Sequence, residues 1–288
     1  MPIHSEILTN PKADRVRRIA DLARPKGRDK AGRFLVEGPQ AVREAVAWTP
    51  GAIRDLYVAV EEEPDAWVVA NPVLEAIVDA SQQADSPIYV HLATPEVLDR
   101  ISKDAQGILA VVDMGAVAAD PGAVAVGDAP FVAACYEVRD PGNAGTVIRA
   151  ADAAGCDAVA LVGDCVDPLN PKVVRATAGS LFHLPVLRME ADGFVDWAHG
   201  HGMTVVAADV HGADGNPPEP LPALLEDQAL VRGGKAVLFG NEAHGLGPAM
   251  LAKADRVATI PIYGKAESLN LATSAAVMLM GMAAAAHR

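Results

Sequence analysis

The chain has 288 residues, of which 51% are hydrophobic and 21% charged, a composition that indicates globular domains and excludes a disordered protein. Its net charge of −13 argues against a protein that coats nucleic acid through its overall charge. No apolar run reaches the roughly 20 residues that span a bilayer, and no signal-peptide pattern opens the chain. Because the three cysteines form no Cys-x-x-Cys pair, we expect a cytoplasmic protein with reduced thiols and no membrane contact.

The first 112 residues predict a small α/β domain, because helical and strand-like patterns alternate along them. The polar stretch from Arg24 to Gly32 is expected to be a loop, and Glu37-Gly38-Pro39 is expected to open a helix. Apolar spacing predicts the other helices at 11–23, 64–80 and 95–102, and strands at 34–36, 53–60, 88–91 and 108–112.

Residues 113–129 are rich in Ala, Gly, Asp and Pro and are expected to link this domain to a second one at 130–288. Continuous apolar strands such as Ala158–Val162 suit a parallel sheet that is covered on both faces. The second domain is predicted to contain strands at 131–136, 158–162, 204–208, 236–239 and 257–260, a loop at 212–222, and helices at 143–154, 170–178, 193–200, after Pro248 and at 269–286.

Positive charge is concentrated near the N-terminus. Residues 1–54 hold 11 Lys and Arg against 6 Asp and Glu, or +5, whereas the rest of the chain holds 13 against 31, or −18. Phosphate binding needs a local positive field and not a positive total. A nucleic-acid contact and a merely solvated basic helix both remain open on charge alone.

Three tracts share one pattern, in which a strand end turns into a helix and presents small residues, an amide and a charged group. The first, Asp140–Arg149, could receive an anion at its helix N-terminus. Arg149 lies in a largely apolar helix, so we expect its guanidinium to meet a carboxylate or phosphate, with a solvent-facing arginine as the alternative.

The second and third tracts add further polar groups. In Phe239–Gly247, three glycines permit close approach of a ligand, and Glu242 is expected to contact a cation or several donors. In Ser268–Asn270, Ser268 is expected to cap the following helix. Asn270 is expected to lie inside that helix as a placed hydrogen-bonding group.

Several other chemistries lack their signatures. Gly142-x-x-Gly145 does not have the spacing of a dinucleotide fingerprint, and no Gly-Lys-Ser/Thr follows it. We expect no metal site, because His199, His201 and His211 have no matching ligand set. Hydrolase motifs such as Gly-x-Ser-x-Gly are missing from the sequence as well.

In their order and in their residues, the three tracts resemble the three motifs of the SpoU/TrmH branch of the SPOUT methyltransferases, which methylate ribose 2′-hydroxyls of RNA. Residues 34–45 and 106–110 are similar to the substrate-recognition domain that precedes the catalytic domain in rRNA-methylating members. The resemblance implies an α/β RNA-binding domain at 1–112, a linker at 113–129, and at 130–288 an α/β SPOUT domain with a parallel sheet and a deep trefoil knot. It also implies a homodimer that acts on RNA, most simply rRNA.

The same resemblance implies a site for S-adenosylmethionine within the knot and roles for individual residues. Arg149 would grip the neighbouring phosphate and assist deprotonation of the hydroxyl. Ala243 departs from the Gly of many members. Leu271-Ala-Thr273 departs from their usual Val-Ser-Val. The implied catalytic residues are Arg149, Asn143, Glu242, Ser268 and Asn270; the implied cofactor contacts are Leu238, Gly240, Ile260, Gly264 and Leu269; and the expected RNA contacts are Arg15, Arg18, Arg28, Lys30 and Arg33.

Three other functions remain as alternatives. The chain could methylate tRNA, or it could be a noncatalytic RNA-binding or ribosome-assembly factor on the same fold. A nucleotide-dependent oxidoreductase on a doubly wound sheet is disfavoured, because the glycine fingerprint and its acidic ribose-binding partner are missing.

Overall fold

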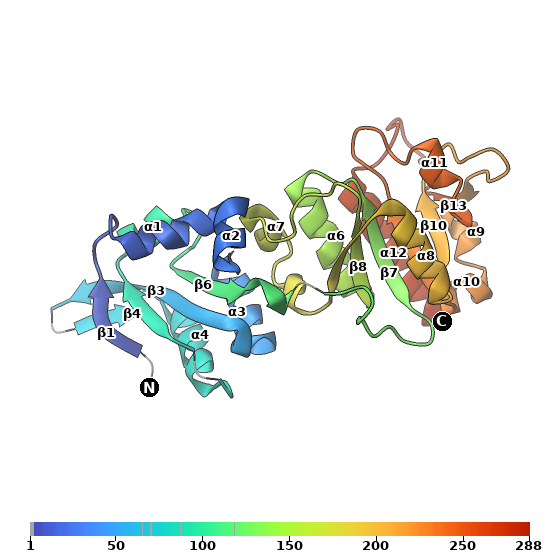
Figure 1. The fold of residues 1–288 in the computed structure, drawn as a ribbon. Coiled ribbons are helices and arrows are strands. Elements are labelled where there is room, and N and C mark those ends of the chain that lie inside the picture. The colour runs from blue at the N-terminus through green and yellow to red at the C-terminus, as the bar shows by residue number, and fades with distance from the viewer. Residues whose placement is uncertain (1–2, 65, 70, 87, 118) are drawn as a thin grey trace. The chain divides into compact units, whose positions relative to one another are not determined.

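The computed structural model describes residues 3–64, 66–69, 71–86, 88–117 and 119–288. The chain forms two compact units (Figure 1). The first contains Met1–Val117 together with Leu169–His183, and the second contains Ala118–Pro168 together with Leu184–Arg288. Both units are α/β, as the sequence predicts.

The first unit is built on a mixed sheet in the order β1-β5-β3-β6-β2, with β4 paired to β3. Strands β1, β5 and β3 run parallel, and β6 is antiparallel to both β3 and β2. Its elements are β1 (Ile3–Leu8), α1 (Asp14–Ala20), α2 (Pro25–Ala31), β2 (Arg33–Glu37), α3 (Pro39–Trp48), β3 (Ile53–Glu63), β4 (Ala66–Val69), α4 (Pro72–Gln83), β5 (Val90–Ala93), α5 (Pro95–Ile101) and β6 (Ile108–Asp113).

Alternation along β2 assigns its side chains to two cores. Leu35 packs with Val16 of α1 and Val97 of α5 in one buried cluster. Phe34 points to the other face, where its ring stacks on that of Phe182 with the centroids 6.5 Å apart. Apolar residues therefore fill both faces of this sheet.

Two predictions for the first unit are wrong in whole or in part. The expected loop at 24–32 contains α2, which begins at Pro25 and ends at Ala31; Gly32 caps it in the left-handed conformation that suits glycine. The expected helix at 64–80 is confirmed only from Pro72, where α4 begins, and strand β4 precedes it. The side chain of Asn71 accepts hydrogen bonds from the backbone of Val73 and Leu74, which fixes the start of α4 at Pro72. Strand β1 lies outside all the predicted elements.

A segment from the second half of the sequence packs within the first unit. It contains α7 (Pro171–Ala176), the expected helix at 170–178, and a 3-10 helix at Ser180–Phe182. Arg175 of α7 forms an ion pair with Glu37, whose side chain is 2% exposed, and lies 3.0 Å from Asp104. A buried carboxylate requires such a partner. By its contacts the segment 169–183 thus groups with the first unit, whereas the predicted domain boundaries place it within 130–288.

The second unit is built on a parallel sheet in the order β11-β13-β10-β12-β7-β8-β9. Residues Phe131–Cys135 and all of Ala158–Val162 are buried, which confirms the predicted parallel sheet covered on both faces. Its strands are β7 (Phe131–Tyr136), β8 (Ala158–Val162), β9 (Val186–Met189), β10 (Thr204–Ala208), β11 (Glu219–Pro220), β12 (Lys235–Phe239) and β13 (Arg256–Thr259).

Helices cover both faces of this sheet. Val132 and Ala134 of β7 pack with Phe194 of α8 in one buried cluster, whereas α6 and α12 lie against each other and against β7 and β12. The predicted loop at 212–222 contains β11 and the start of α9, because Pro220 and Leu221 begin a short helix. The helices are α6 (Pro141–Ala153), α8 (Ala191–Gly200), α9 (Leu221–Leu224), α10 (Gln228–Arg232), α11 (Pro248–Leu251) and α12 (Leu271–Ala286).

Two further observations concern the chain as a whole. Cys135, Cys156 and Cys165 are buried and free, as expected of small core residues. Across the part of the chain that the structure describes, no helix combines the length and apolarity needed to cross a bilayer.

Candidate active site

The three sequence tracts lie at one edge of the second unit's sheet. They follow β7, β12 and β13, which run parallel in the sheet order β13-β10-β12-β7. Parallel strands end at the same edge, where ligands of open α/β sheets bind. Segments that are far apart in sequence thus meet there. The side chains of Asn143 and Glu242, for example, are 99 residues apart in sequence and form a hydrogen bond.

Glu242 joins the second tract to the first. Its Oε1 accepts a hydrogen bond of 3.1 Å from Nδ2 of Asn143 and one of 3.2 Å from the backbone N–H of Asp140. Its Oε2 lies 3.5 Å from the backbone N of Arg139. The carboxylate thus sits on donors at the start of α6, where a negative charge is favoured. This confirms the expected contact of Glu242 with several donors, one of which is the Asn143 amide.

Asn270 joins the third tract to the first. Its Nδ2 donates to Oδ1 of Asn143 at 3.0 Å, while its own Oδ1 accepts from the backbone N–H groups of Ala272 at 2.9 Å and Thr273 at 3.3 Å. Asn270 is therefore the N-cap of α12, which corrects the expectation that Ser268 is the cap and that Asn270 lies inside the helix. The capping bonds fix the amide so that its nitrogen faces Asn143.

A cavity of about 840 Å³ opens beside this network. Its volume is in the range of small-molecule sites. Apolar side chains of Phe239, Leu271 and Met278 contribute to its wall. The predicted residues that line it are Asn143, Gly240, Glu242, Ile260, Ser268, Leu269 and Asn270.

Gly240 is required by the fold of the loop after β12. A Cβ atom at this position would lie 2.4 Å from the backbone carbon of Gly245 and 2.6 Å from the nitrogen of Leu246. The loop turns back on itself there, and backbone hydrogen bonds join Asn241 to Gly245 in both directions. The side chain of Asn241 also donates to the carbonyl of Glu137 at 2.7 Å, which holds the loop against the first tract.

Three predicted residues lie outside the cavity wall. Leu238 is buried inside β12, and Gly264 is exposed beyond the lining. Arg149 is exposed on α6 and has no hydrogen bond or ion pair among the described residues. Arg149 follows Asn143 by six residues. At about 100° per residue, the two side chains point about 120° apart around the helix axis. Arg149 therefore faces a different direction from the network.

Sequence reasoning missed part of the wall. Asp209 and His211 follow β10, which lies between β12 and β13, and both line the cavity together with Glu267. Oδ1 of Asp209 accepts from the backbone N–H of His211 at 2.7 Å and of Gly212 at 2.9 Å. The position of Asp209 at the end of a buried strand was the available signal. Among the residues described, no cluster of three His, Cys, Asp or Glu could hold a metal ion.

Both units match families of known proteins. Residues 130–280 match the SpoU rRNA Methylase family, and residues 13–110 match the MRM3-like substrate binding domain. The chain belongs to the SpoU rRNA methylase family. The resemblance found in its motifs and in its N-terminal half is thereby confirmed.

Individual SpoU relatives match over nearly the whole chain. The 23S rRNA (guanosine(2553)-2'-O)-methyltransferase RlmP of Bacillus subtilis is 30% identical over 274 residues, which cover 94% of this chain and 97% of that protein. The 23S rRNA (uridine(2479)-2'-O)-methyltransferase of Streptomyces viridochromogenes is 31% identical, covering 88% and 83%. The crystal structure of an AdoMet-bound rRNA methyltransferase from Sinorhizobium meliloti is similar with a TM-score of 0.78 and 27% identity, covering 98% of both chains.

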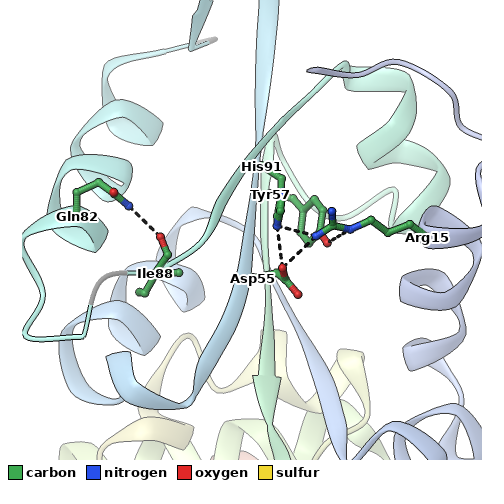
Figure 2. Close-up of polar contacts among 6 residues, drawn as sticks. All are labelled: Arg15, Asp55, Tyr57, Gln82, Ile88 and His91. Carbon is green, nitrogen blue, oxygen red and sulfur yellow. Dashed lines mark hydrogen bonds and ion pairs between the residues drawn. The ribbon is translucent and has the colours of Figure 1, made fainter. Parts of the chain in front are cut away.

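Within the substrate-binding domain, Arg15 belongs to a polar cluster at the sheet (Figure 2). Its guanidinium donates to the Tyr57 hydroxyl at 2.9 Å and lies 3.0 Å from Asp55 and 2.6 Å from the His91 ring. Burial raises the pKa of Tyr57 to about 12. For Asp55, burial raises the pKa, but the hydrogen bond with His91 and the charges of His91 and Arg15 outweigh it and leave the pKa lowered. The cluster ties α1 to β3 and β5.

The other predicted RNA contacts differ in exposure. Arg28 is 1% exposed and donates to the carbonyl of Leu22 at 3.1 Å, so its side chain does not reach RNA at the surface, and this prediction is corrected. The polar surroundings of Arg28 in sequence concealed its burial. Arg18 and Lys30 are exposed, and Arg33 is half-buried, 3.5 Å from Asp113.

Proposed function

We propose that the protein transfers a methyl group from S-adenosylmethionine to a ribose 2′-hydroxyl of rRNA. The hydrogen-bond chain from Asn270 through Asn143 to Glu242, at the wall of a cavity of about 840 Å³, carries this proposal. The named 23S rRNA methyltransferases that match most of the chain support rRNA as the substrate. A tRNA substrate has no comparable support.

The cavity fits an adenosine cofactor. Its apolar wall at Phe239, Leu271 and Met278 suits a purine, and the backbone at Gly240, Ile260 and Leu269 offers hydrogen-bonding groups. The relative from Sinorhizobium meliloti was solved with AdoMet bound. When bound, the cofactor supplies a methyl group on a positively charged sulfur. The fold of the family also leads us to propose that the loops after β12 and β13 form a trefoil knot.

The amide network orients the reacting hydroxyl. Asn143 donates one hydrogen bond to Glu242 and accepts one from Asn270, so both the nitrogen and the oxygen of its amide are fixed. Each of the two amide NH₂ groups keeps a second hydrogen for an oxygen of the ribose. Holding the hydroxyl in line with the methyl group accounts for much of the acceleration in such transfers. Glu242 acts as a positioning residue, because it holds Asn143 in this orientation.

Arg149 supplies the remaining element, a grip on the phosphate next to the reacting ribose. Its guanidinium is exposed and has no partner among the described residues, which leaves it available for a phosphate. Arg149 also assists removal of the hydroxyl proton in this proposal, because the phosphate that it anchors lies beside the hydroxyl.

The exposed face of α6 and α12 is proposed to bind a second copy of the chain. The two helices pack side by side, and α12 exposes Val277 by 41% and Met280 by 46%, one turn apart. Arg149 is exposed on α6, the helix that packs against α12. An apolar strip of this kind favours association. In such a homodimer, Arg149 of one subunit reaches a site that both subunits share.

The reaction is tested with S-adenosylmethionine labelled in its methyl group and transcripts of 23S rRNA and of tRNA. We expect label on a ribose of rRNA, mapped by the resistance of the adjoining phosphodiester to alkaline cleavage. Arg149→Ala should lose turnover while calorimetry still detects cofactor binding, and Arg188→Ala, at an exposed arginine of β9, should keep it. Label on a base, or normal turnover by Arg149→Ala, would contradict the assignment.

The homodimer is tested by light scattering. Val277→Asp should convert a dimer into a monomer, because it places a charge in the apolar strip. Val73→Asp, at a valine of α4 that is 58% exposed, is the matched control and should leave the dimer intact. A wild-type monomer with full activity would refute this part of the proposal. Because its bacterial relatives modify 23S rRNA, we also propose that the protein works in the cytoplasm.

A further inference from the structure

The cofactor cavity is lined by carboxylates and not by fixed cations. Asp209, Glu242 and Glu267 contribute to its wall, and the lining residues that the structure describes include no Lys or Arg. Two histidines, His211 and His244, also line the cavity. A ligand in this cavity therefore experiences a negative field from three loops.

The three carboxylates are engaged to different extents. Glu242 accepts bonds from the start of α6 through both oxygens, so its charge is balanced by local donors. In Asp209 only Oδ1 is used, for the backbone of His211 and Gly212. Within the described structure, Oδ2 of Asp209 and both oxygens of Glu267 accept no hydrogen bond. Neither of these two carboxylates has an ion-pair partner among the described residues.

The position of Asp209 directs this charge toward the site. It follows β10, which pairs with both β12 and β13, so it lies between the two loops that supply Gly240 and Ile260 to the wall. Its free Oδ2 is also close to the β12 loop, because a Cβ atom placed on Gly245 would be 3.7 Å from it. Glu267 lines the cavity from the loop after β13, immediately before Ser268.

We propose that Asp209 and Glu267 make the cavity select the reactant form of the cofactor over its product by charge. The inference rests on the proposed function. In methyl transfer the sulfur–methyl bond breaks, the methyl group bonds to the ribose oxygen, and the hydroxyl proton passes to solvent water. The sulfur keeps the bonding electron pair, so a sulfonium cation becomes a neutral thioether, S-adenosylhomocysteine. The attraction of the carboxylates disappears at that moment, which favours release of the product and binding of a fresh cofactor.

Calorimetry with three ligands isolates the charge. S-adenosylmethionine carries the sulfonium, S-adenosylhomocysteine carries no charge at that position, and sinefungin carries an ammonium group there without a transferable methyl. The wild-type protein should bind the two cationic ligands about three- to tenfold more tightly than the neutral one, as expected for charges partly screened by water. The preference should shrink at 1 M salt, where the Debye length falls to about 3 Å.

Asp209→Asn removes the charge and keeps Oδ1 to accept from His211 and Gly212, so the turn after β10 remains supported. It should weaken binding of both cationic ligands about threefold or more and leave the neutral ligand unchanged or bound more tightly. Glu267→Gln should act in the same direction and provides a second test if Asp209→Asn folds poorly. Asp196→Asn, at an exposed aspartate of α8, is the control and should change none of the three affinities.

The outcomes separate this inference from the function on which it rests. Wild-type protein that binds none of the three ligands would overturn both. Equal wild-type affinity for all three, or an equal loss for all three in Asp209→Asn and Glu267→Gln, would overturn the charge selection and leave the proposed function standing. An effect confined to the cationic ligands in both variants would establish it.

Discussion

Replacing Gly240 by alanine should disrupt the cofactor site through backbone geometry. The added Cβ would lie 2.4, 2.6 and 2.7 Å from three backbone atoms of Gly245 and Leu246, distances that side-chain rotation does not relieve. Overpacking of this kind costs about 1 to 3 kcal/mol. If the loop moves to relieve the clash, the same energy weakens cofactor binding by about 5- to 150-fold. We also expect the Tm to fall by about 2 to 4 °C for each kcal/mol.

Gly247→Ala is the matched control in the same loop. A Cβ at Gly247 meets no atom within 4 Å, and the residue has an ordinary φ of −67°. Its effect on the Tm and on the dissociation constant of S-adenosylmethionine should therefore be small. Thermal unfolding followed by circular dichroism and titration calorimetry measure both quantities. Identical Tm and affinity in the two variants would refute the argument that the close backbone approach at Gly240 shapes the site.

Three further results are expected. Asn143→Asp should lower kcat/KM for methyl transfer by about 10²-fold, because it places a carboxylate where an amide donates to Glu242; unchanged kinetics would remove Asn143 from the mechanism. Hydrogen bonds from Arg256 lower the pKa of Glu219 below 4.5 and that of Asp227 below 3.8. The stability that these two ion pairs provide is therefore present above those values and is lost as the pH falls through the lowered pKa. Arg256→Gln should flatten the drop in Tm between pH 5 and 3, which calorimetry measures. Arg15→Met should lower the Tm, because it removes the hydrogen bonds of Arg15 to Tyr57 and Asp55 in the cluster of Figure 2. Arg18→Met, at an exposed arginine, should leave the Tm unchanged and weaken RNA binding in a filter assay.

Local patterns in the sequence determined the parts of the site that depend on chain neighbours. Apolar runs such as Ala158–Val162 are long enough to specify buried parallel strands, and turn residues at their ends place polar groups at one edge of the sheet. The convergence of Asn143, Glu242 and Asn270 follows from that arrangement, since each belongs to the segment that follows a parallel strand.

Only the tertiary structure decided which partner each polar group meets. Arg28 lies in a polar stretch of sequence and Arg18 next to apolar Ile19, yet Arg28 is buried and Arg18 is exposed, because burial depends on elements that pack from elsewhere. Arg175 belongs with the first unit because the buried carboxylate of Glu37, 138 residues away, requires a cation. Contacts across such separations leave no periodic trace in the chain, so the sequence specifies the elements while their packing selects the partners.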